Sequence, residues 1–353
     1  LIVTGVQTCA LPISFYIART GRPGPVLVDV TKDVQNAVLE GFDYDAIEID
    51  LPGYNPAKNA ASPESIARAA KLINEAERPV IVSGQGTTMA GAEKELRQLA
   101  EKAQIPVSTS LLGIGTIPST HPLAISWGGM HGQAHTNFAW QEADVLVAIG
   151  ARLDDRLTGA FDTFAPKAKI VHIDIDPAEM GKNLNIDTPV VGDALMTRRE
   201  LIPQVEANEH PDWIEQINEW KTEGAERDLL AQEMETLHAP YIMRSLWHAT
   251  NEGDATVVTD VGQHQMWEAQ YFPHTKERSL LTSGGLGTMG FALPAAIGAQ
   301  MGKPQEEVWV VAGDGGFQMT MIEMKTVMEQ RLPIKDRKST RLNSSHDQIS
   351  YAV

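Results

Sequence analysis

The chain has 353 residues, of which 42% are hydrophobic and 21% are charged, and its formal net charge is −17. A chain of this length holds about two domains, with room for part of a third, and its composition is that of an ordinary globular protein. The acidic excess argues against nucleic acids and anionic membranes as partners. No apolar run approaches the roughly 18–20 residues of a membrane span. The single cysteine, Cys9, excludes an intramolecular disulfide and a cysteine-based zinc site, so we expect a reducing, cytoplasmic location.

The two ends of the chain differ from the body between them. Residues 1–14 carry no charge and no clean periodicity, and residues 336–353 turn polar where an apolar strand is expected. Both segments resemble translated adapter or vector sequence, and the alternative is a natural terminus that frays. We expect both to be non-native and to lie outside the fold.

Residues 15–45 predict a short helix, a turn GRPGP and a buried strand, VLVDV. Arg22 lies in that turn between glycines and a proline, where it is either a fixed cation or a solvated loop residue. Residues 46–61 contain prolines and no period, which is typical of a linker.

Residues 62–202 repeat a β/α unit. Ser62 and Pro63 predict the cap and first turn of a helix. Near-continuous Val/Ile runs then alternate with helical patterns, which indicates a parallel sheet covered on both faces. We expect one doubly wound domain whose strands lie in PVIVSGQG, IPVSTSLLGIG, ADVLVAIG, AKIVHIDIDP and TPVVGD.

A second β/α series follows an acidic stretch, residues 203–240, that reads as a linker helix region. The series occupies residues 241–335, with strands in ATVVTDVG, SLLTS and VWVVAGDGG, and it stops in the middle of its sheet. The predicted fold class is therefore α/β, with consecutive doubly wound parallel-sheet domains of which the first and last are incomplete.

The strand VWVVA ends in a turn that is suited to a phosphate and a metal ion. Asp314 follows Gly313 and precedes Gly315 and Gly316, and a glycine cluster lies upstream at 284–290. Ligands bind open α/β sheets at the carboxyl ends of their strands, glycines admit a phosphate, and a carboxylate suits Mg²⁺. The alternative is a turn that uses glycine and aspartate only as turn formers.

DVGQHQMW, residues 260–267, also follows a strand of the second series. Gln263, His264 and Gln265 would therefore share a rim with Asp314. A lone histidine in a turn is more often structural or solvated, and the shared rim is what favours a functional role.

Three further turns lie in the middle domain: GGMHG, GARLDDR and HIDIDPAE. Glycine turns at strand ends let the backbone approach a phosphate, and Arg152 and Arg156 can pair with that phosphate. A carboxylate at a strand end can accept hydrogen bonds from ribose hydroxyls. Each signal is weak alone, because Asp174 and Asp176 could simply cap the next turn. Together they predict a dinucleotide across the switch point of the sheet.

These motifs, in this order, carry a family resemblance. GRPGPVLVD, GMHG, GARLDDRLTG, HIDIDPAE, DVGQHQMW, GGLGTMGFALPAAIGA and GDGGFQMT resemble the catalytic (large) subunits of acetolactate synthase, over about residues 15–335. The resemblance implies a thiamine-diphosphate-dependent transferase that condenses pyruvate with a second 2-ketoacid. The products are 2-acetolactate or 2-aceto-2-hydroxybutyrate, in isoleucine and valine biosynthesis.

The resemblance also implies three ligands and their residues. Residues 15–45 would end an aminopyrimidine-binding domain, 62–202 would bind a structural FAD, and 241–335 would bind the diphosphate and Mg²⁺. The implied FAD residues are Arg22, Gly84, Gly86, Gly129, Met130, His131, Gly132, Arg152, Asp155, Arg156, Asp174, Ile175, Asp176 and Asp193. Those for thiamine diphosphate are Gly262, Gln263, His264, Gly287, Met289, Gly313, Gly315 and Gly316, with Asp314 as the metal ligand.

Two groups of the family pattern have no counterpart in this sequence. The activating glutamate belongs to the first domain, before Phe15, so we expect no retained catalytic residue. The second magnesium ligand, an asparagine, is expected at 340–341, where Thr340 and Arg341 stand, and Asn343 does not lie in a buried-strand pattern. We therefore expect the chain as given to be an inactive fragment.

The partners implied by the resemblance are 2-ketoacids, a homodimer or homotetramer, and a small regulatory subunit. Rival readings are another thiamine-dependent carboligase or oxidase, and a flavin- or nicotinamide-binding module without carboligation. A third reading is a fragment with no function of its own.

Overall fold

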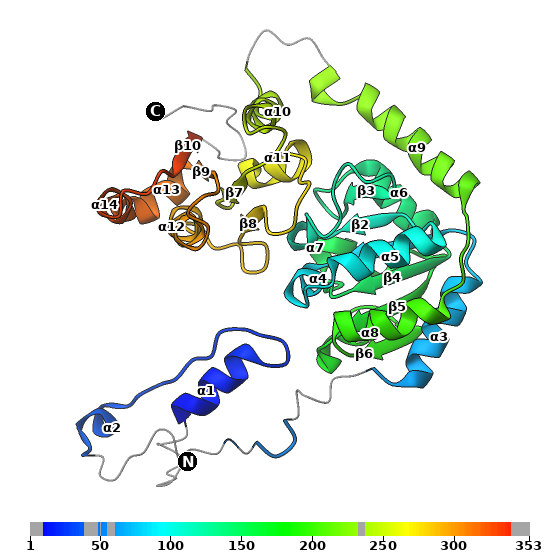
Figure 1. Ribbon diagram of the computed structural model, residues 1–353, viewed down its shortest axis with the longest axis horizontal. Coiled ribbons are helices and arrows are strands. Elements are labelled where there is room, and N and C mark those ends of the chain that lie inside the picture. The colour runs from blue at the N-terminus through cyan, green and yellow to red at the C-terminus, as the bar shows by residue number, and fades with distance from the viewer. Residues whose placement is uncertain (1–9, 39–48, 50, 55–60, 232–236, 340–353) are drawn as a thin grey trace.

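The computed structural model describes residues 10–38, 49, 51–54, 61–231 and 237–339. Its central domain is built on a six-stranded parallel sheet with the order β3-β2-β1-β4-β5-β6 (Figure 1). The strands are β1 (Pro79–Ser83), β2 (Val107–Thr109), β3 (Ala124–Trp127), β4 (Val145–Ile149), β5 (Lys169–Asp174) and β6 (Thr188–Val191).

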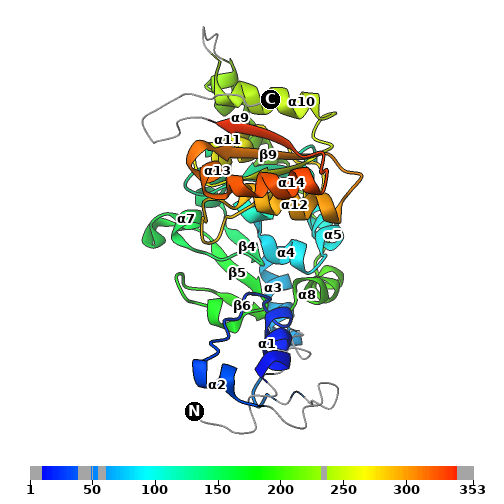
Figure 2. The ribbon, with the colours of Figure 1, turned by 90° about the vertical axis from the view of Figure 1, so that its left-hand side faces the viewer.

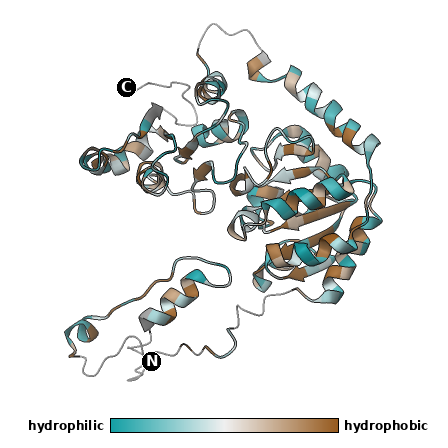
Figure 3. Cartoon of the chain, in the orientation of Figure 1, coloured by the Kyte–Doolittle hydropathy of each residue, from teal (hydrophilic) through white to brown (hydrophobic). Residues whose placement is uncertain are grey.

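Helices cover both faces of this sheet, so its inner strands are apolar on both sides. Every residue of β1 and of β4 is buried, and the apolar side chains form one core on each face. The strands of this sheet are accordingly brown, which marks hydrophobic residues, in Figure 3. Parallel sheets require such double cover, which is why these strands read as continuous Val/Ile runs. The helices are α3 (Pro63–Asn74), α4 (Gln85–Met89), α5 (Glu93–Ala103), α6 (Ala134–Glu142), α7 (Asp155–Thr158), α8 (Ala194–Leu201) and α9 (Pro211–Glu226).

The predicted cap of α3 is present. The Ser62 hydroxyl accepts a hydrogen bond from the Ser65 amide, Pro63 occupies the first turn, and Ile66 and Ile73 lie on the buried face. This arrangement satisfies one orphan amide and buries a single apolar stripe. The helix of the acidic stretch, α9, is anchored by Trp213, whose indole nitrogen donates to the Pro79 carbonyl at 3.1 Å.

A second parallel sheet has four strands in the order β10-β9-β7-β8. They are β7 (Thr256–Thr259), β8 (Leu280–Thr282), β9 (Val308–Gly313) and β10 (Lys335–Ser339). The helices around them are α10 (Ala239–Ala249), α11 (Gln263–Tyr271), α12 (Ala292–Gly302), α13 (Asp314–Thr320) and α14 (Met324–Glu329). The expected α/β class with doubly wound parallel sheets is confirmed.

The predicted strand VLVDV is wrong for this structure. Residues 23–31 form no strand, and the Leu27 side chain is 93% exposed. A strand needs a neighbour to receive its main-chain hydrogen bonds, and among the described residues none lies beside this segment. The short strand β3 was not predicted, because Ser126 adopts a left-handed φ of 68° that interrupts the β pattern.

The expectation that residues 1–14 and 336–353 lie outside the fold is wrong for two short pieces. The first helix, α1 (Ala10–Arg19), begins before Phe15, and strand β10 continues past Lys335 to Ser339 beside β9. Strand pairing uses main-chain groups, so a polar sequence does not prevent it. Residues 1–9 and 340–353, including Thr340, Arg341 and Asn343, lie outside the described residues. Within the described part of the chain, no helix has the length and apolarity needed to cross a membrane.

A buried polar network braces the loop between α11 and β8 in the second sheet domain. His274 contacts Glu268 through Nε2 at 2.8 Å and Ser279 through Nδ1 at 2.7 Å, and all three side chains are buried. The same loop meets the central domain, where the Ser119 amide donates to the His274 carbonyl at 2.8 Å and Arg278 donates to the Thr88 carbonyl. The network therefore fixes the surface on which the two domains meet.

We predict that His274→Ala is strongly destabilising. Removal of the imidazole leaves the fully buried Glu268 carboxylate without its partner, and such losses cost about 3–5 kcal/mol. Urea unfolding measures the change. Asp254→Ala is the control, because the Asp254 side chain in the same region is 67% exposed, and no resolvable change is expected. Equal effects of the two substitutions would contradict the assigned role of the network.

Candidate functional site

A cavity of about 710 Å³ lies where the order of the central sheet reverses. The reversal falls between β1 and β4, whose carboxyl ends carry Gly84 and Gly150. Open α/β sheets bind ligands at such a switch point. The cavity wall also includes Val261–Gly262 and Ser283–Gly287 from the second sheet domain, so both domains contribute to one space.

The glycines of the two turns have different roles. A Cβ on Gly84 would lie 2.2 Å from the Gly150 carbonyl oxygen, and one on Gly86 would lie 2.6 Å from the Gly150 Cα. Side chains would therefore push the two turns apart. Gly86 and Gly150 line the cavity, whereas Gly84 is packed behind them against Ala151.

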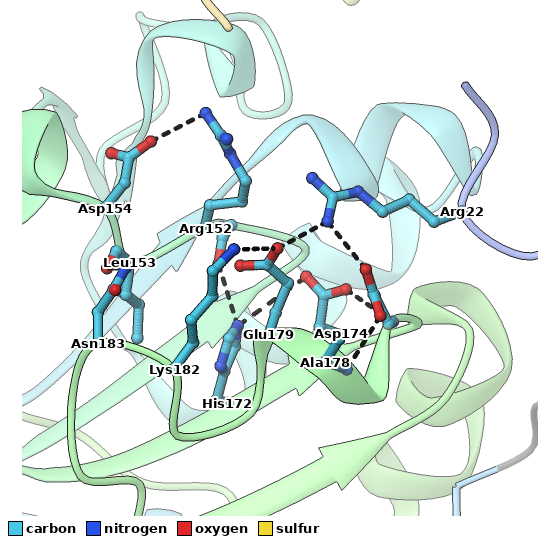
Figure 4. A network of polar contacts seen from close by, with 12 residues as sticks. Arg22, Arg152, Leu153, Asp154, His172, Asp174, Ala178, Glu179, Lys182 and Asn183 are labelled. Atoms are coloured by element: carbon cyan, nitrogen blue, oxygen red, sulfur yellow. Dashed lines mark hydrogen bonds and ion pairs between the residues drawn. The ribbon is translucent and has the colours of Figure 1, made fainter. Parts of the chain in front are cut away.

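Arg22 reaches the rim of this cavity and is paired there. Its Nη1 lies 3.0 Å from Asp176 Oδ2 and 2.8 Å from Glu179 Oε1 (Figure 4). Burial opposes the charge of Arg22, but the hydrogen bonds to Glu179 and Asp176 outweigh burial and raise its pKa. The structure thus favours the fixed cation over the solvated loop residue. Asp176 also caps the following turn, since it accepts the Ala178 amide.

Asp174 ends β5 and lines the cavity. Burial raises the pKa of its carboxyl group, although the Asp176 amide donates to Oδ1 at 2.9 Å. Its neighbour His172 is buried, and burial lowers the pKa of that imidazole against the field of Asp174. His172 Nε2 lies 3.0 Å from the Ala151 carbonyl oxygen, which ties β5 to the turn after β4 (Figure 4).

The loop 128–132 is joined to the start of α7 by its backbone. The Met130 amide donates to the Arg156 carbonyl at 2.9 Å, and a Cβ on Gly129 would lie 2.8 Å from that same oxygen. His131 and Arg156 line the cavity, while Arg152 pairs with Asp154 at 2.9 Å. Asp155 is the first residue of α7, and Asp154 caps that helix.

Ten of the residues implied by the family resemblance line the cavity. They are Arg22, Gly86, His131, Arg152, Arg156, Asp174, Ile175, Asp193, Gly262 and Gly287. The other predicted residues do not line this cavity. Asp193, at the carboxyl end of β6, also uses its carboxylate to cap α8.

A second group of lining residues is absent from the set implied by the resemblance, although Gln265 and the glycine cluster at 284–290 had been singled out from the sequence. The members of this group are Gln85, Met89, Ala90, Ser110, Leu111, Leu112, Trp127, Gly128, Gly150, Ala151, Asp154, Leu157, Ala194, Val261, Gln265, Met266, Ser283, Gly284, Gly285, Leu286, Gly21 and Pro23. Several of them directly follow predicted strands. Their position at the carboxyl end of a strand was therefore the feature of the sequence that could have predicted a place in the cavity wall.

The second sheet has its own reversal, between β7 and β9. Asp260 follows β7 and Asp314 follows Gly313, the last residue of β9, so both carboxylates stand at one edge. The expected shared rim of Asp314 with residues 263–265 is therefore formed by the starts of α11 and α13.

His264 is buried between two of these turns. Burial lowers its pKa to about 4 against the opposing field of Asp260, so the imidazole is neutral at pH 7. Within the described part of the chain, neither ring nitrogen has a hydrogen-bond partner, and the same holds for Gln263 Oε1. Ring atoms of His264 would lie within 3.2 Å of a Cβ placed on Gly262 or Gly313. Buried polar atoms without protein partners are rare and indicate a bound water or a ligand.

Asp314 has one carboxylate oxygen engaged by its own turn. Oδ1 accepts the Gly315 amide at 2.9 Å, and the side chain is only partly buried. No cluster of three His, Cys, Asp or Glu side chains suited to a metal occurs among the residues that the structure describes. Met289 lies over the same turn, with its methyl group 3.3 Å from a Cβ placed on Gly315.

Comparison with protein families assigns both domains to one class. Residues 66–201 match the central domain of thiamine pyrophosphate enzymes, and residues 260–335 match their C-terminal TPP binding domain. The chain therefore belongs to the thiamine pyrophosphate enzymes.

Within that class, the similar curated proteins are acetolactate synthase large subunits. The probable large subunit of Methanocaldococcus jannaschii is 46% identical over 91% of this chain and 55% of its own length. The large subunit of Corynebacterium glutamicum is 45% identical over 92% of this chain and 52% of its own length. The chain thus spans about half the length of the curated relatives it matches. The resemblance expected from the motifs is confirmed.

We predict that Gly86→Ala destabilises the central domain. The added methyl group meets the backbone of Gly150 at 2.6 Å, which cannot move without separating β1 from β4. Overpacking of this kind costs about 1–3 kcal/mol, measurable as a lower melting temperature. Gly224→Ala in α9 is the control, because nothing lies within 4 Å and alanine favours a helix. A Gly86→Ala protein as stable as the wild type would refute the close approach.

We also predict that Arg22 contributes stability at neutral pH that is lost in acid. Burial opposes ionisation of Asp176 and Glu179, but hydrogen bonds, including those from Arg22, lower both pKa values. A carboxyl group whose pKa is lower in the folded than in the unfolded chain stabilises the fold at any pH above its pKa in the unfolded chain. This stabilisation is lost as the pH falls below about 4 and the carboxylates are protonated.

The measurement is the difference in unfolding free energy between the wild type and Arg22→Ala at pH 7, 5 and 3. The difference should be present at pH 7 and shrink towards pH 3. Lys71→Ala, which breaks an exposed pair with Glu75, gives the background. A difference that grows on acidification would have the wrong sign for this network.

Proposed function

We propose that the chain is part of an acetolactate synthase catalytic subunit, a transferase that condenses pyruvate with a second 2-ketoacid. The observation that carries the proposal is the rim formed by DVGQHQ and GDGG at the second switch point, which opens beside the cavity of the central domain. The products would be 2-acetolactate or 2-aceto-2-hydroxybutyrate, in branched-chain amino-acid biosynthesis. The names of the similar proteins support this assignment.

Thiamine diphosphate would be held by the turns of the second sheet. Its residues would be Gly262, Gln263, His264, Gly287, Met289, Gly313, Gly315 and Gly316. The residues present fit this group, because His264 and Gln263 hold buried polar atoms that lack protein partners. Bound thiamine diphosphate supplies the electron sink for decarboxylation of a 2-ketoacid. The chain would orient it, with the neutral His264 contributing a hydrogen bond and no charge.

Magnesium would bind through Asp314. One of its carboxylate oxygens is not engaged by the Gly315 amide, and Mg²⁺ commonly takes one or two carboxylates together with phosphate oxygens and water. A dedicated cage of several side chains is therefore unnecessary. The metal would neutralise part of the diphosphate charge and so reduce the repulsion between the diphosphate and the nearby Asp260 carboxylate.

FAD would occupy the cavity of the central domain. The volume of about 710 Å³ suits a large cofactor, and the strand order at β1 and β4 is that of dinucleotide-binding sheets. We assign to it the implied residues from Arg22 to Asp193, with Gly84, Gly129, Gly132 and Asp155 shaping the turns behind the wall. Leu112 packs on Gly284, and this contact between domains would exclude water from the space between the two cofactors.

The domain assignments belong to the same proposal. Residues 15–45 would end the aminopyrimidine domain, 46–61 would link it to the central FAD domain at 62–202, and 203–240 would lead to the diphosphate domain at 241–335. A cytoplasmic location is also proposed, in keeping with the single cysteine.

A second copy of the chain is the proposed oligomeric partner. Helices α13 and α14 face the viewer in Figure 2. On and between them, Met319, Met321, Ile322 and Met328 are each more than half exposed. Exposed apolar side chains that gather on neighbouring elements mark protein contacts. A homodimer or homotetramer would cover them, and a small regulatory subunit is a further proposed partner.

The rival reading, a flavin- or nicotinamide-binding module, is favoured by the strand order of the central sheet alone. That reading does not explain why residues 260–335 match a TPP binding domain. The two readings differ in one measurable property, which is magnesium-dependent binding of thiamine diphosphate.

We predict that the chain binds thiamine diphosphate in the presence of Mg²⁺ and that Asp314→Ala abolishes the metal dependence. Loss of the carboxylate removes the protein ligand that would hold the metal against the diphosphate. Isothermal titration with and without Mg²⁺ measures the effect. Asp254→Ala is the control, because that carboxylate lies in the same domain but is exposed and pairs with Lys276.

FAD is titrated separately as an internal check. Its binding should survive Asp314→Ala, because Asp314 does not line the central cavity. A chain that binds FAD but no thiamine diphosphate would support the rival module and reject the proposed function.

A further inference from the structure

The N-terminus of α12 is capped by a residue from a different strand. The helix follows the glycine cluster, and its own N-cap position, Phe291, has no side-chain acceptor. Helices leave their first amides without partners, and a serine or aspartate at the cap usually fills that need. Here the acceptor is Asp260, at the carboxyl end of β7 and 1% exposed.

The Asp260 carboxylate accepts hydrogen bonds from two turns. Oδ2 accepts the Ala292 amide at 3.1 Å and the Gly290 amide at 3.0 Å. Oδ1 lies 3.1 Å from the Gly290 nitrogen and accepts the Val261 amide at 2.9 Å. One buried carboxylate therefore joins the turn after β7 to the glycine cluster.

The same carboxylate also touches the third turn of the rim. A Cβ on Gly316 would lie 2.2 Å from Asp260 Oδ1 and 2.5 Å from Cγ. Glycine is required at 316 because Asp260 fills the space where a side chain would start. The turns at 261–262, 287–290 and 313–316 thus meet at a single acidic side chain.

This arrangement has an electrostatic consequence. A helix N-terminus attracts anions through its dipole and its free amides. At α12 that position is already filled by the protein's own carboxylate, whose negative charge repels a second anion. A diphosphate bound at this rim is therefore directed to the turns that begin α11 and α13.

We propose that Asp260 is a positioning residue of the rim: a built-in anion that occupies the α12 N-terminus and fixes where a diphosphate can bind. The identity of the external anion, thiamine diphosphate, rests on the proposed function. The occupancy of the α12 N-terminus by the Asp260 carboxylate is independent of that function.

The first test needs no cofactor. In Asp260→Ala the amides of Gly290 and Ala292 lose their acceptor, so an external anion can replace it. We expect inorganic phosphate at millimolar concentration to raise the melting temperature of this variant by about 2–4 °C more than that of the wild type. The increment should saturate, whereas general salt effects do not. A chloride series at equal ionic strength and the Asp254→Ala variant give the background.

An equal phosphate response of Asp260→Ala, Asp254→Ala and the wild type would overturn the proposal. A variant that folds only when phosphate is present would support it. If Asp260→Ala does not fold under either condition, the affinity of Asp260→Asn for thiamine diphosphate decides, because the amide keeps the shape of the side chain and removes its charge.

The second test measures affinity for thiamine diphosphate with Mg²⁺. Asp260→Asn should weaken binding by about ten- to hundredfold, because one amide oxygen must then serve the amides of Val261, Gly290 and Ala292, and the loosened turns no longer hold the diphosphate. Asp254→Asn should leave the affinity unchanged.

The two tests separate the two claims. If the wild type does not bind thiamine diphosphate, the proposed function fails, and the phosphate-dependent melting still decides the role of Asp260. If the wild type binds and Asp260→Asn binds equally well, the positioning role is wrong and the proposed function stands.

Discussion

The structure depends on the contact between the central domain and the second sheet domain. The cavity at the switch point of the central sheet is shared, because the turns after β7 and β8 supply part of its wall. The loop after α11 docks on the central domain. That loop is held from inside by Glu268, His274 and Ser279, and its outer side receives the Ser119 amide. A buried carboxylate and imidazole are costly to desolvate, so their value here is in fixing a geometry rather than in net stability.

Close backbone packing imposes the second constraint on the site. Gly86 against Gly150 in one domain, and Gly316 against Asp260 in the other, leave no room for a Cβ. From the sequence, glycines at strand ends indicate phosphate binding. The structure shows that Gly86 combines two uses, because it lines the cavity and also packs on the Gly150 backbone, whereas Gly84 is packed behind the cavity wall and Gly316 leaves room for Asp260.

Long buried strands and amphipathic helices were predictable from the sequence because their signals are local. The runs in β1 and β4 and the cap of α3 depend on residues next to one another in the chain. The failures are non-local. VLVDV lacks a strand partner, β3 contains a left-handed serine, and the polar β10 is stabilised by pairing with β9. Asp260 was passed over for the same reason, since its partners lie 30 and 32 residues away.

Net charge poses the remaining physical question, which is how a chain of charge −17 could receive anionic cofactors. At the rim of the second sheet, side-chain cations do not provide the answer, because the segments 260–267, 283–291 and 313–318 contain no lysine or arginine. The attraction must come instead from main-chain amides at the helix starts and from a divalent cation at Asp314. Amides cannot be moved independently of the backbone, so the placement of the turns determines the affinity. A single buried carboxylate that holds three turns together then has more influence on binding than any surface charge.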